Sequence, residues 1–205
     1  ITYEDVTNVD AVGLITARSG LEIGLAGVGG TITSAGIITA PHLKTGGGTN
    51  NNTALGNSSL AVVYSSTGTG NVAVGDYVLD GNSTGSYNVG VGYAALTQNT
   101  TGANNVAVGR GTLDANTTAN NNTAVGDNAL TANTTAANNT AVGYNALSSN
   151  TTGTGNVALG AQALENATTA DYNTAIGLQA LDTCTTGSNN TAVGFYAAYN
   201  LTTGT

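Results

Sequence analysis

Short apolar segments recur at a fixed interval along most of the chain. Each is an N-x-A-x-G phrase or a close variant, in which Val, Leu or Ile stands directly before the Gly and Leu usually follows four residues after it. The first interval, from Gly56 to Gly75, is 19, and each of the seven later intervals is 17, as from Gly126 to Gly143. The glycines are Gly56, Gly75, Gly92, Gly109, Gly126, Gly143, Gly160, Gly177 and Gly194. Nine matches in phase indicate a repeat architecture.

Each repeat unit predicts one short strand followed by one turn region. Asn, Thr, Val and Gly are poor helix formers, and a unit of this length is too short for a pair of helices. The N-x-A-x-G phrase is β-favouring and ends on a turn residue. Constant phase predicts an all-β fold, a parallel β-solenoid or β-roll of nine coils, with one coil for each 17-residue repeat. With neighbouring strands about 4.8 Å apart, nine coils span about 43 Å. The longer first interval predicts an irregular first coil.

Alternation along the strand assigns residues to two faces. In the repeat Asn122–Val125, Thr123 and Val125 point to one side, while Asn122 and Ala124 point to the other. Because the position before Gly is always apolar, we expect Val125 inside the coil with Leu130 as its partner. We then expect the small Ala on the outward face, where another backbone can approach closely.

A thin core favours association of several chains. One Val and one Leu per coil contribute about 1.5–3 kcal/mol each on burial. Ordering each backbone residue costs about 1–2 kcal/mol. We therefore expect the Ala face to be buried against other copies of the chain, with a homotrimer as the favoured assembly.

Asn stands four residues before every one of the nine glycines. Asn side chains in register can hydrogen-bond to one another along a stack or to the backbone of a turn. We therefore predict a structural repeat ladder formed by Asn52, Asn71, Asn88, Asn105, Asn122, Asn139, Asn156, Asn173 and Asn190.

The phrase N-T-A-V-G-Y-N-A-L-x-x-N-T-T-G, from Asn139 to Gly153, resembles a known family of repeats. It is similar to the YadA-like head repeats of trimeric autotransporter adhesins and, equally, to repeats in bacteriophage tail-fibre proteins. The resemblance covers roughly residues 50–205 and implies a left-handed parallel β-roll, three chains around one axis and a role in surface attachment. The usual adhesin repeat is shorter than the unit found here.

The first 44 residues do not share the repeat. They contain one approximate repeat, since the sequence of Gly13–Ala17 is similar to that of Gly36–Ala40. Gly-rich turns separate short β-branched segments. We expect residues 1–44 to form a β-rich shaft or neck and residues 45–205 to form the solenoid. The N-terminal segment resembles structural proteins of marine phages. A lone His42 beside Pro41 is interpreted as a packing residue at the junction, with a metal ligand shared by three chains as the alternative.

Composition excludes some partners. The chain has 3 Lys and Arg against 11 Asp and Glu, which gives a net charge of -8, so a basic surface for nucleic acid is ruled out. No apolar run approaches the length of a membrane span, and we expect no membrane insertion.

The sequence predicts neither an enzyme nor a cofactor site. Cys184 stands where five other repeats have Asn, and the one His lies far away along the rod, so a structural substitution is favoured over a catalytic thiol. No phosphate-binding, dinucleotide-binding or Ca²⁺-binding loop motif is complete.

Three sets of side chains are candidates for surface contacts. Asp80, Asp114, Glu165 and Asp182 each stand five residues after their Gly. Glu165 and Asp182 belong to adjacent coils, and we favour two solvated turn carboxylates over a bridging cation. Arg110 and Asp127 also occupy adjacent coils and predict an exposed ion pair. Aromatic residues just after the Gly are candidates for contacts with sugars, but packing between chains or against a neighbouring turn is favoured. These residues are Tyr77, Tyr93, Tyr144, Phe195 and Tyr196.

These observations favour a structural role. The leading interpretation is a trimeric viral tail-fibre rod, located in the virion, that spaces or presents a host-attachment domain. Its expected partners are its own copies, other virion tail proteins and, through a domain outside this chain, a host receptor or glycan. The alternatives are a bacterial trimeric surface adhesin or a secreted extracellular filament. An ice- or glycan-binding solenoid is less favoured, because the Thr pairs sit at turns rather than on a strand.

Overall fold

The computed structural model describes residues 24–25, 28–29, 51–60 and 68–204. Contacts divide the chain into two units, Ile1–Pro41 and His42–Thr205. In the first unit, β1 (Gly24–Leu25) pairs antiparallel with β2 (Val28–Gly29). The remaining expectations for residues 1–44, including the role of His42, lie outside the described residues.

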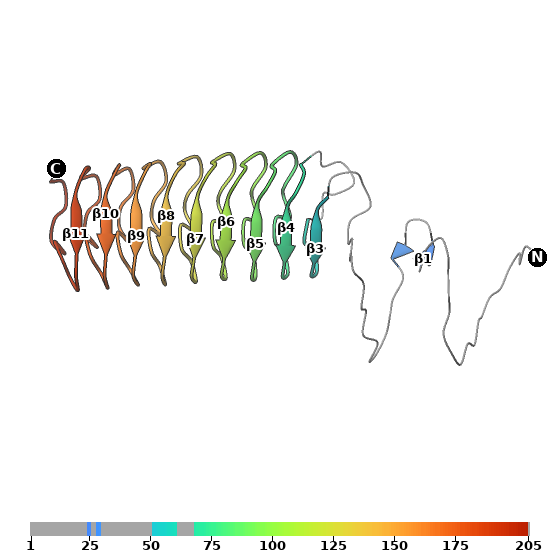
Figure 1. Ribbon diagram of the computed structural model, residues 1–205, viewed down its shortest axis with the longest axis horizontal. Helices are drawn as coiled ribbons and strands as arrows, with labels where there is room; N and C mark the ends of the chain where they lie inside the picture. The colour runs from blue at the N-terminus through green and yellow to red at the C-terminus, as the bar shows by residue number, and fades with distance from the viewer. Residues whose placement is uncertain (1–23, 26–27, 30–50, 61–67, 205) are drawn as a thin grey trace, which may run out of the picture. The chain divides into compact units, whose positions relative to one another are not determined.

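The second unit contains one parallel sheet of nine strands, one from each repeat. The strands lie side by side in chain order, and each is three residues long (Figure 1). They are β3 (Thr53–Leu55), β4 (Val72–Val74), β5 (Val89–Val91), β6 (Val106–Val108), β7 (Thr123–Val125), β8 (Thr140–Val142), β9 (Val157–Leu159), β10 (Thr174–Ile176) and β11 (Thr191–Val193). The predicted parallel β-solenoid is therefore confirmed.

Successive strands pair with the same repeat positions opposite each other. Ala124 pairs with Ala141 at the common offset of 17, whereas Ala54 pairs with Ala73 at the longer offset of 19. Leu60 and Leu79 keep the longer offset, while Gly68 and Gly85 have returned to the common one. The two extra positions of the first interval therefore fall between Leu60 and Gly68, in a segment that lies largely outside the described residues.

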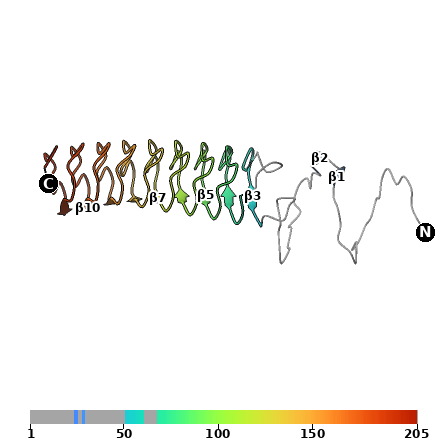
Figure 2. The same ribbon diagram turned by 90° about the horizontal axis from the view of Figure 1, so that it is seen from above.

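Hydrogen bonds join neighbouring coils along the turns as well as along the strands. Leu130 N–H donates to Ala146 C=O of the next coil at 3.0 Å, and Asn128 N–H donates to Arg110 C=O of the previous coil at 2.9 Å. Seen from above, the coils follow one another as narrow loops along one axis (Figure 2). Each coil is thus held by the coil before it and the coil after it, as in other solenoids.

The interior is built from Ala, Leu and Asn, and the predicted assignment of strand faces is wrong. Ala124 is fully buried, whereas Thr123 and Val125 on either side of it remain partly exposed. Most other strands show the same pattern, with a buried central Ala or Gly between two more exposed residues. The Ala column therefore packs inside its own chain, and the larger β-branched residues face outward.

The reason for this inversion is the narrowness of the coil. Leu130 fills the interior from the opposite side, and the seven other leucines of its column are also fully buried. Where Val78 replaces the usual small residue three positions after the Gly, the next strand carries Gly90 instead of Ala. A Cβ on Gly90 would lie 2.4 Å from Val78 Cγ1. A second large apolar side chain, Val78, is therefore accommodated in the coil of Leu79 where the facing strand residue has no Cβ.

The buried leucines adopt a strained backbone conformation. Leu130 has φ of 52°, in the left-handed region, and seven other leucines in the same column have similar values. This conformation costs about 1–2 kcal/mol for a residue with a Cβ. Full burial of a Leu side chain contributes about 1.5–3 kcal/mol, which offsets that cost.

At the end of every strand except the last, β11, the Gly is required by both conformation and space. Gly126 has φ of 135°, and a Cβ at this position would lie 2.4 Å from the carbonyl oxygen of Gly143. The next coil therefore occupies the volume that any other residue would need.

Replacing this glycine should destabilise the solenoid. We expect Gly126→Ala to lower the free energy of unfolding by at least about 1–3 kcal/mol, because it combines backbone strain with a clash against the next coil. Gly111→Asn is a matched control: Gly111 has φ of 61°, and Asn128 adopts a similar φ of 55° at the same position of the next coil. Urea unfolding of both variants measures the difference, and equal stability of the two would contradict this account.

Candidate functional site

The nine asparagines form a ladder, called here the first Asn ladder, in which all members except the partly exposed Asn190 are buried. Asn139 Oδ1 accepts hydrogen bonds from the backbone N–H of Asn156 at 2.9 Å and from its Nδ2 at 3.3 Å. Asn139 Nδ2 donates to the C=O of Gly153, at the far end of the same coil, at 2.9 Å. One side chain thus joins the two ends of its own coil and also binds the next coil.

A second Asn ladder runs parallel to the first and comes from the N-T-T and N-S-T phrases. Its members are fully buried, namely Asn82, Asn99, Asn116, Asn133 and Asn150. Each Nδ2 donates to the carbonyl oxygen three residues later, and from Asn99 on it also donates to Oδ1 of the preceding member. Sequence reasoning missed this ladder, although the signal was present: these five asparagines follow one another at the repeat interval of 17.

The second ladder ends inside the solenoid. Ala167 and Cys184 take the equivalent positions in the next two coils, and both are buried. Because Ala167 has no amide, Asn150 Oδ1 is left buried without a hydrogen-bond partner. Cys184 Sγ lies 3.4 Å from Gly187 C=O, and burial raises the pKa of its thiol. These contacts make Cys184 a packing residue of the ladder column.

The outward residues of β3–β11 form a surface, called here the sheet face, that consists of two columns of side chains. One column is apolar in every coil: Leu55, Val74, Val91, Val108, Val125, Val142, Leu159, Ile176 and Val193. The other column alternates irregularly between Val and Thr. Leu159 is 46% exposed. An apolar strip of this length is unusual on the surface of a monomer.

The predicted surface aromatics lie at the turn after each strand and are exposed. Tyr77 and Tyr93 form an edge-to-face pair with ring centroids 5.8 Å apart. Phe195 and Tyr196 form another, with centroids 4.3 Å apart. Tyr144 has no aromatic neighbour within the described part of the chain, so the five predicted residues do not form one site.

The carboxylates of the acidic column are less exposed than predicted. Asp182 is only 5% exposed, so the prediction of a solvated carboxylate is wrong for this residue. Its Oδ1 accepts a hydrogen bond from Asn166 Nδ2 at 3.0 Å, and its Oδ2 accepts one from Gln179 Nε2 at 3.3 Å. Glu165 in the previous coil is held in the same way by Asn145 and Gln162. Amide donors therefore hold both carboxylates.

Burial and the neighbouring charge both act on Asp182. Desolvation raises the pKa of this carboxyl, and repulsion from Glu165 raises it further. The negative charge of Asp182 in turn raises the pKa of Tyr199 in the following coil. Among the described residues, no group of three or more His, Cys, Asp and Glu side chains is arranged to hold a metal ion.

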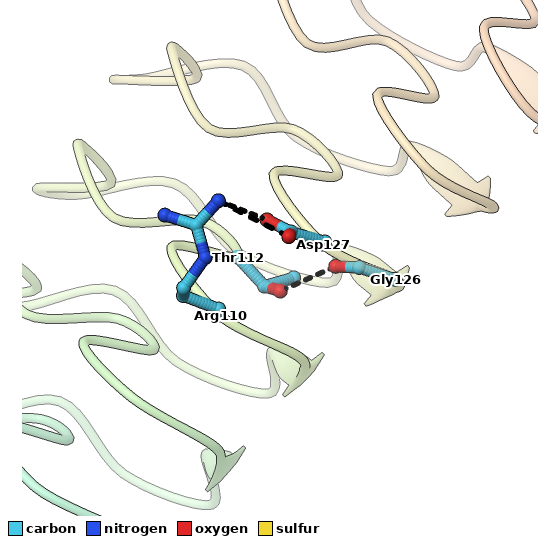
Figure 3. Close-up of polar contacts among 4 residues, drawn as sticks. All are labelled: Arg110, Thr112, Gly126 and Asp127. Atoms are coloured by element: carbon cyan, nitrogen blue, oxygen red, sulfur yellow. Dashed lines mark hydrogen bonds and ion pairs between the residues drawn. The ribbon is translucent and has the colours of Figure 1, made fainter.

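The predicted ion pair between adjacent coils is present. Arg110 Nη2 lies 3.0 Å from Asp127 Oδ1, and 62% and 40% of the two side chains are exposed (Figure 3). Beside it, the Thr112 hydroxyl donates to Gly126 C=O at 2.7 Å. Because solvent screens it, the ion pair contributes at most about 1 kcal/mol.

Comparisons with known proteins do not assign the chain. No family model matches its sequence, and no curated protein or solved structure matches it. No helix within the described residues is long and apolar enough to cross a membrane.

Breaking the first Asn ladder should destabilise the fold. Asn139→Leu removes the acceptor of Asn156 and the donor to Gly153, and leaves buried polar groups unpaired at a cost of about 1–3 kcal/mol. Asn138→Gly is the control, because Asn138 is exposed and its φ of 63° suits glycine. Thermal unfolding measures both variants. An unchanged midpoint for Asn139→Leu would show that the ladder does not hold the coils.

The raised pKa of Asp182 predicts a pH dependence with a definite sign. Between the unfolded pKa of about 3.9 and the higher folded pKa, the folded chain binds more protons, so the free energy of unfolding falls as pH rises through this window. Asp182→Asn should therefore gain stability relative to wild type on going from about pH 3 to about pH 7. Asp114→Asn is the control, because Thr97 and Thr131 flank it in the same column. The measurement is the difference in thermal unfolding midpoint between wild type and Asp182→Asn at each pH. A difference that does not change with pH would refute the link between the protonation of Asp182 and stability.

Proposed function

We propose that this chain is the rod of a homotrimeric fibre, a viral tail-fibre segment that spaces or presents a separate host-attachment domain. The observation that carries the proposal is the regular stack of coils in chain order (Figure 1). A solenoid in which each coil binds only its neighbours gains length with every repeat and keeps a constant cross-section. Such a fold suits a long, stiff spacer.

The sheet face supports the trimeric arrangement. Its Val, Ile and Leu side chains are partly exposed along the whole sheet, and parallel sheets are normally covered on both faces. Copies of the same chain carry the same strip at the same spacing, so symmetric packing covers every coil at once. The sheet face therefore takes the role that the sequence had assigned to the Ala column.

The resemblance to adhesin heads and tail-fibre repeats adds to this argument. Other virion tail proteins, a host receptor or a glycan would be reached through the attachment domain, and the rod itself would belong to the virion. This proposal assigns no catalytic role and no cofactor to the chain.

A charge on the sheet face should separate the copies without unfolding the coil. We expect wild type to sediment at about three times the chain mass of 20.0 kDa. We expect Val125→Asp to weaken association at least about tenfold, because the new carboxylate would be desolvated between chains. Thr118→Asp, at an exposed turn, is the control. Analytical ultracentrifugation gives the masses, and a stable, folded wild-type monomer would overturn the trimer.

A spacer should tolerate the loss of whole repeats. Deleting residues 122–155 removes two coils and joins Asn121 to Asn156 in phase. The rod should remain folded and become shorter by about 10 Å, since each coil adds about 4.8 Å. Small-angle scattering measures the length. Deletion of residues 122–150, which breaks the phase, is the control and should unfold. Loss of folding in the in-phase deletion would contradict the modular rod.

A further inference from the structure

Two exposed tyrosines lie directly on glycines of the preceding coil. A Cβ on Gly70 would lie 2.8 Å from Tyr87 Cδ1 and 3.0 Å from its Cε1. A Cβ on Gly155 would lie 2.6 Å and 2.8 Å from the same atoms of Tyr172. The two tyrosines are 64% and 65% exposed. Each ring therefore rests on backbone while much of its surface remains open to solvent; we call these two sites the tyrosine platforms.

The column that contains the platforms shows that Gly and Tyr occur as a pair. From the first coil to the ninth it reads Asn51, Gly70, Tyr87, Asn104, Asn121, Asn138, Gly155, Tyr172 and Asn189. Gly occurs in this column only in the coil directly before a Tyr. All nine residues have φ between 51° and 69°. Asn and Gly tolerate this left-handed conformation, whereas a bulky aromatic residue is strained there. The strain is not offset by burial of the ring.

The two platforms belong to a longer repeat. Thr67–Gly75 reads TGTGNVAVG, and five coils later Thr152–Gly160 reads TGTGNVALG. Tyr87 and Tyr172 are separated by the same five coils, which correspond to about 24 Å along the sheet. The same arrangement is thus presented twice on one edge of the solenoid.

Local hydrogen bonds fix both platforms in the same way. Tyr87 N–H donates to Thr69 C=O at 2.8 Å, and Tyr172 N–H donates to Thr154 C=O at 2.9 Å. The preceding residue also binds the previous coil: Ser86 Oγ accepts from Thr69 N–H at 3.0 Å. Asp171 Oδ1 accepts from Thr154 N–H at 2.7 Å. Because the backbone at each platform is fixed before binding, a ligand that stacks on the ring orders little more of the chain.

An exposed amide lies next to each platform in the column. Asn104 follows Tyr87 by one coil, and Asn189 follows Tyr172. Both side chains are exposed. Within the described part of the chain, their side-chain amides make no hydrogen bond, although their backbone N–H groups donate to Ser86 and Asp171. Each site therefore combines an aromatic surface with a free donor and acceptor about one strand spacing away.

We propose that the tyrosine platforms bind neutral saccharides, with the apolar face of a pyranose ring stacked on Tyr87 or Tyr172. The C–H groups of that face carry partial positive charge and are attracted to the negative face of the aromatic ring. The amide of Asn104 or Asn189 would bind hydroxyl groups at the ring edge. Anionic saccharides are disfavoured because the chain carries a net charge of -8 and Asp171 precedes Tyr172. This inference goes beyond the proposed spacer role and does not depend on it.

The test uses the full 205-residue chain and cellohexaose, a neutral oligosaccharide whose equatorial hydroxyls leave both ring faces lined with C–H bonds. Saturation-transfer NMR should show transfer to the pyranose protons at millimolar ligand, since one ring and one amide give only weak binding per site. Tyr87→Ala with Tyr172→Ala should weaken this binding at least about tenfold. The corresponding double Phe variant keeps the stacking surface and should bind within about twofold of wild type. Tyr144→Ala is the matched control, because Tyr144 is 53% exposed but lies outside the platforms.

Several results would overturn the proposal. Absence of transfer to cellohexaose, or equal binding by the double Ala variant, would exclude the platforms as saccharide sites. Stronger binding of sialyllactose than of cellohexaose would contradict the neutral class. If the double Ala variant changes the sedimentation coefficient while saccharide transfer persists, the tyrosines are contacts between copies. Circular dichroism melting of each variant separates loss of binding from loss of folding.

Discussion

The hydrogen bond from the backbone N–H of each ladder asparagine to Oδ1 of the asparagine one coil earlier is the contact on which the solenoid depends. This hydrogen bond requires an Asn at the same position in each successive coil. The contact is kept even where the spacing changes: Asn71 N–H donates to Asn52 Oδ1 at 2.8 Å across the longer first interval. The chain therefore accommodates two extra positions in its first interval and preserves the ladder. A buried amide with no partner would cost about 1–3 kcal/mol in every coil.

The ladder and the Leu column together leave a narrow interior, and this space determines which side chains face outward. Ala fits between them, and the exchange of Ala for Gly90 opposite Val78 shows how closely the volumes are matched. Thr112 enters the same interior only with its hydroxyl bonded to Gly126 C=O. The Val, Ile and Leu residues that flank the Ala column must then lie on the sheet face. The same packing that stabilises the coil thus leaves an apolar column on the sheet face.

The period, the strand positions, the parallel stacking and the buried Leu column could be predicted from the sequence, because all follow from phase and residue type. Which face of each strand lies inside the coil could not be predicted from the sequence. Alternation places Asn122 with Ala124 and Thr123 with Val125, but it does not say which pair is inside; choosing the larger apolar residue for the core gave the wrong answer. The left-handed backbone of Leu130 and the burial of Asp182 depend on the closure of the whole coil, which local propensity does not contain. The Gly–Tyr pairs can be found in the sequence, but only the structure shows that each Tyr ring lies on the Gly of the preceding coil.

The solenoid keeps three features apart: amide ladders inside the coils, the sheet face, and the two exposed tyrosine platforms. All three features require that the hydrogen bonds of the ladder amides remain formed in the folded state. Side-chain amide hydrogen exchange, followed by NMR on the Asn Nδ2 groups, tests this most directly. The protons of Asn122, Asn139 and Asn156 should exchange only through global unfolding, at rates that follow the stability of the chain. The exposed Asn104 and Asn189 should exchange at the rates of free asparagine. Exchange of the ladder amides as fast as that of Asn104 would show that the coils do not depend on the ladder.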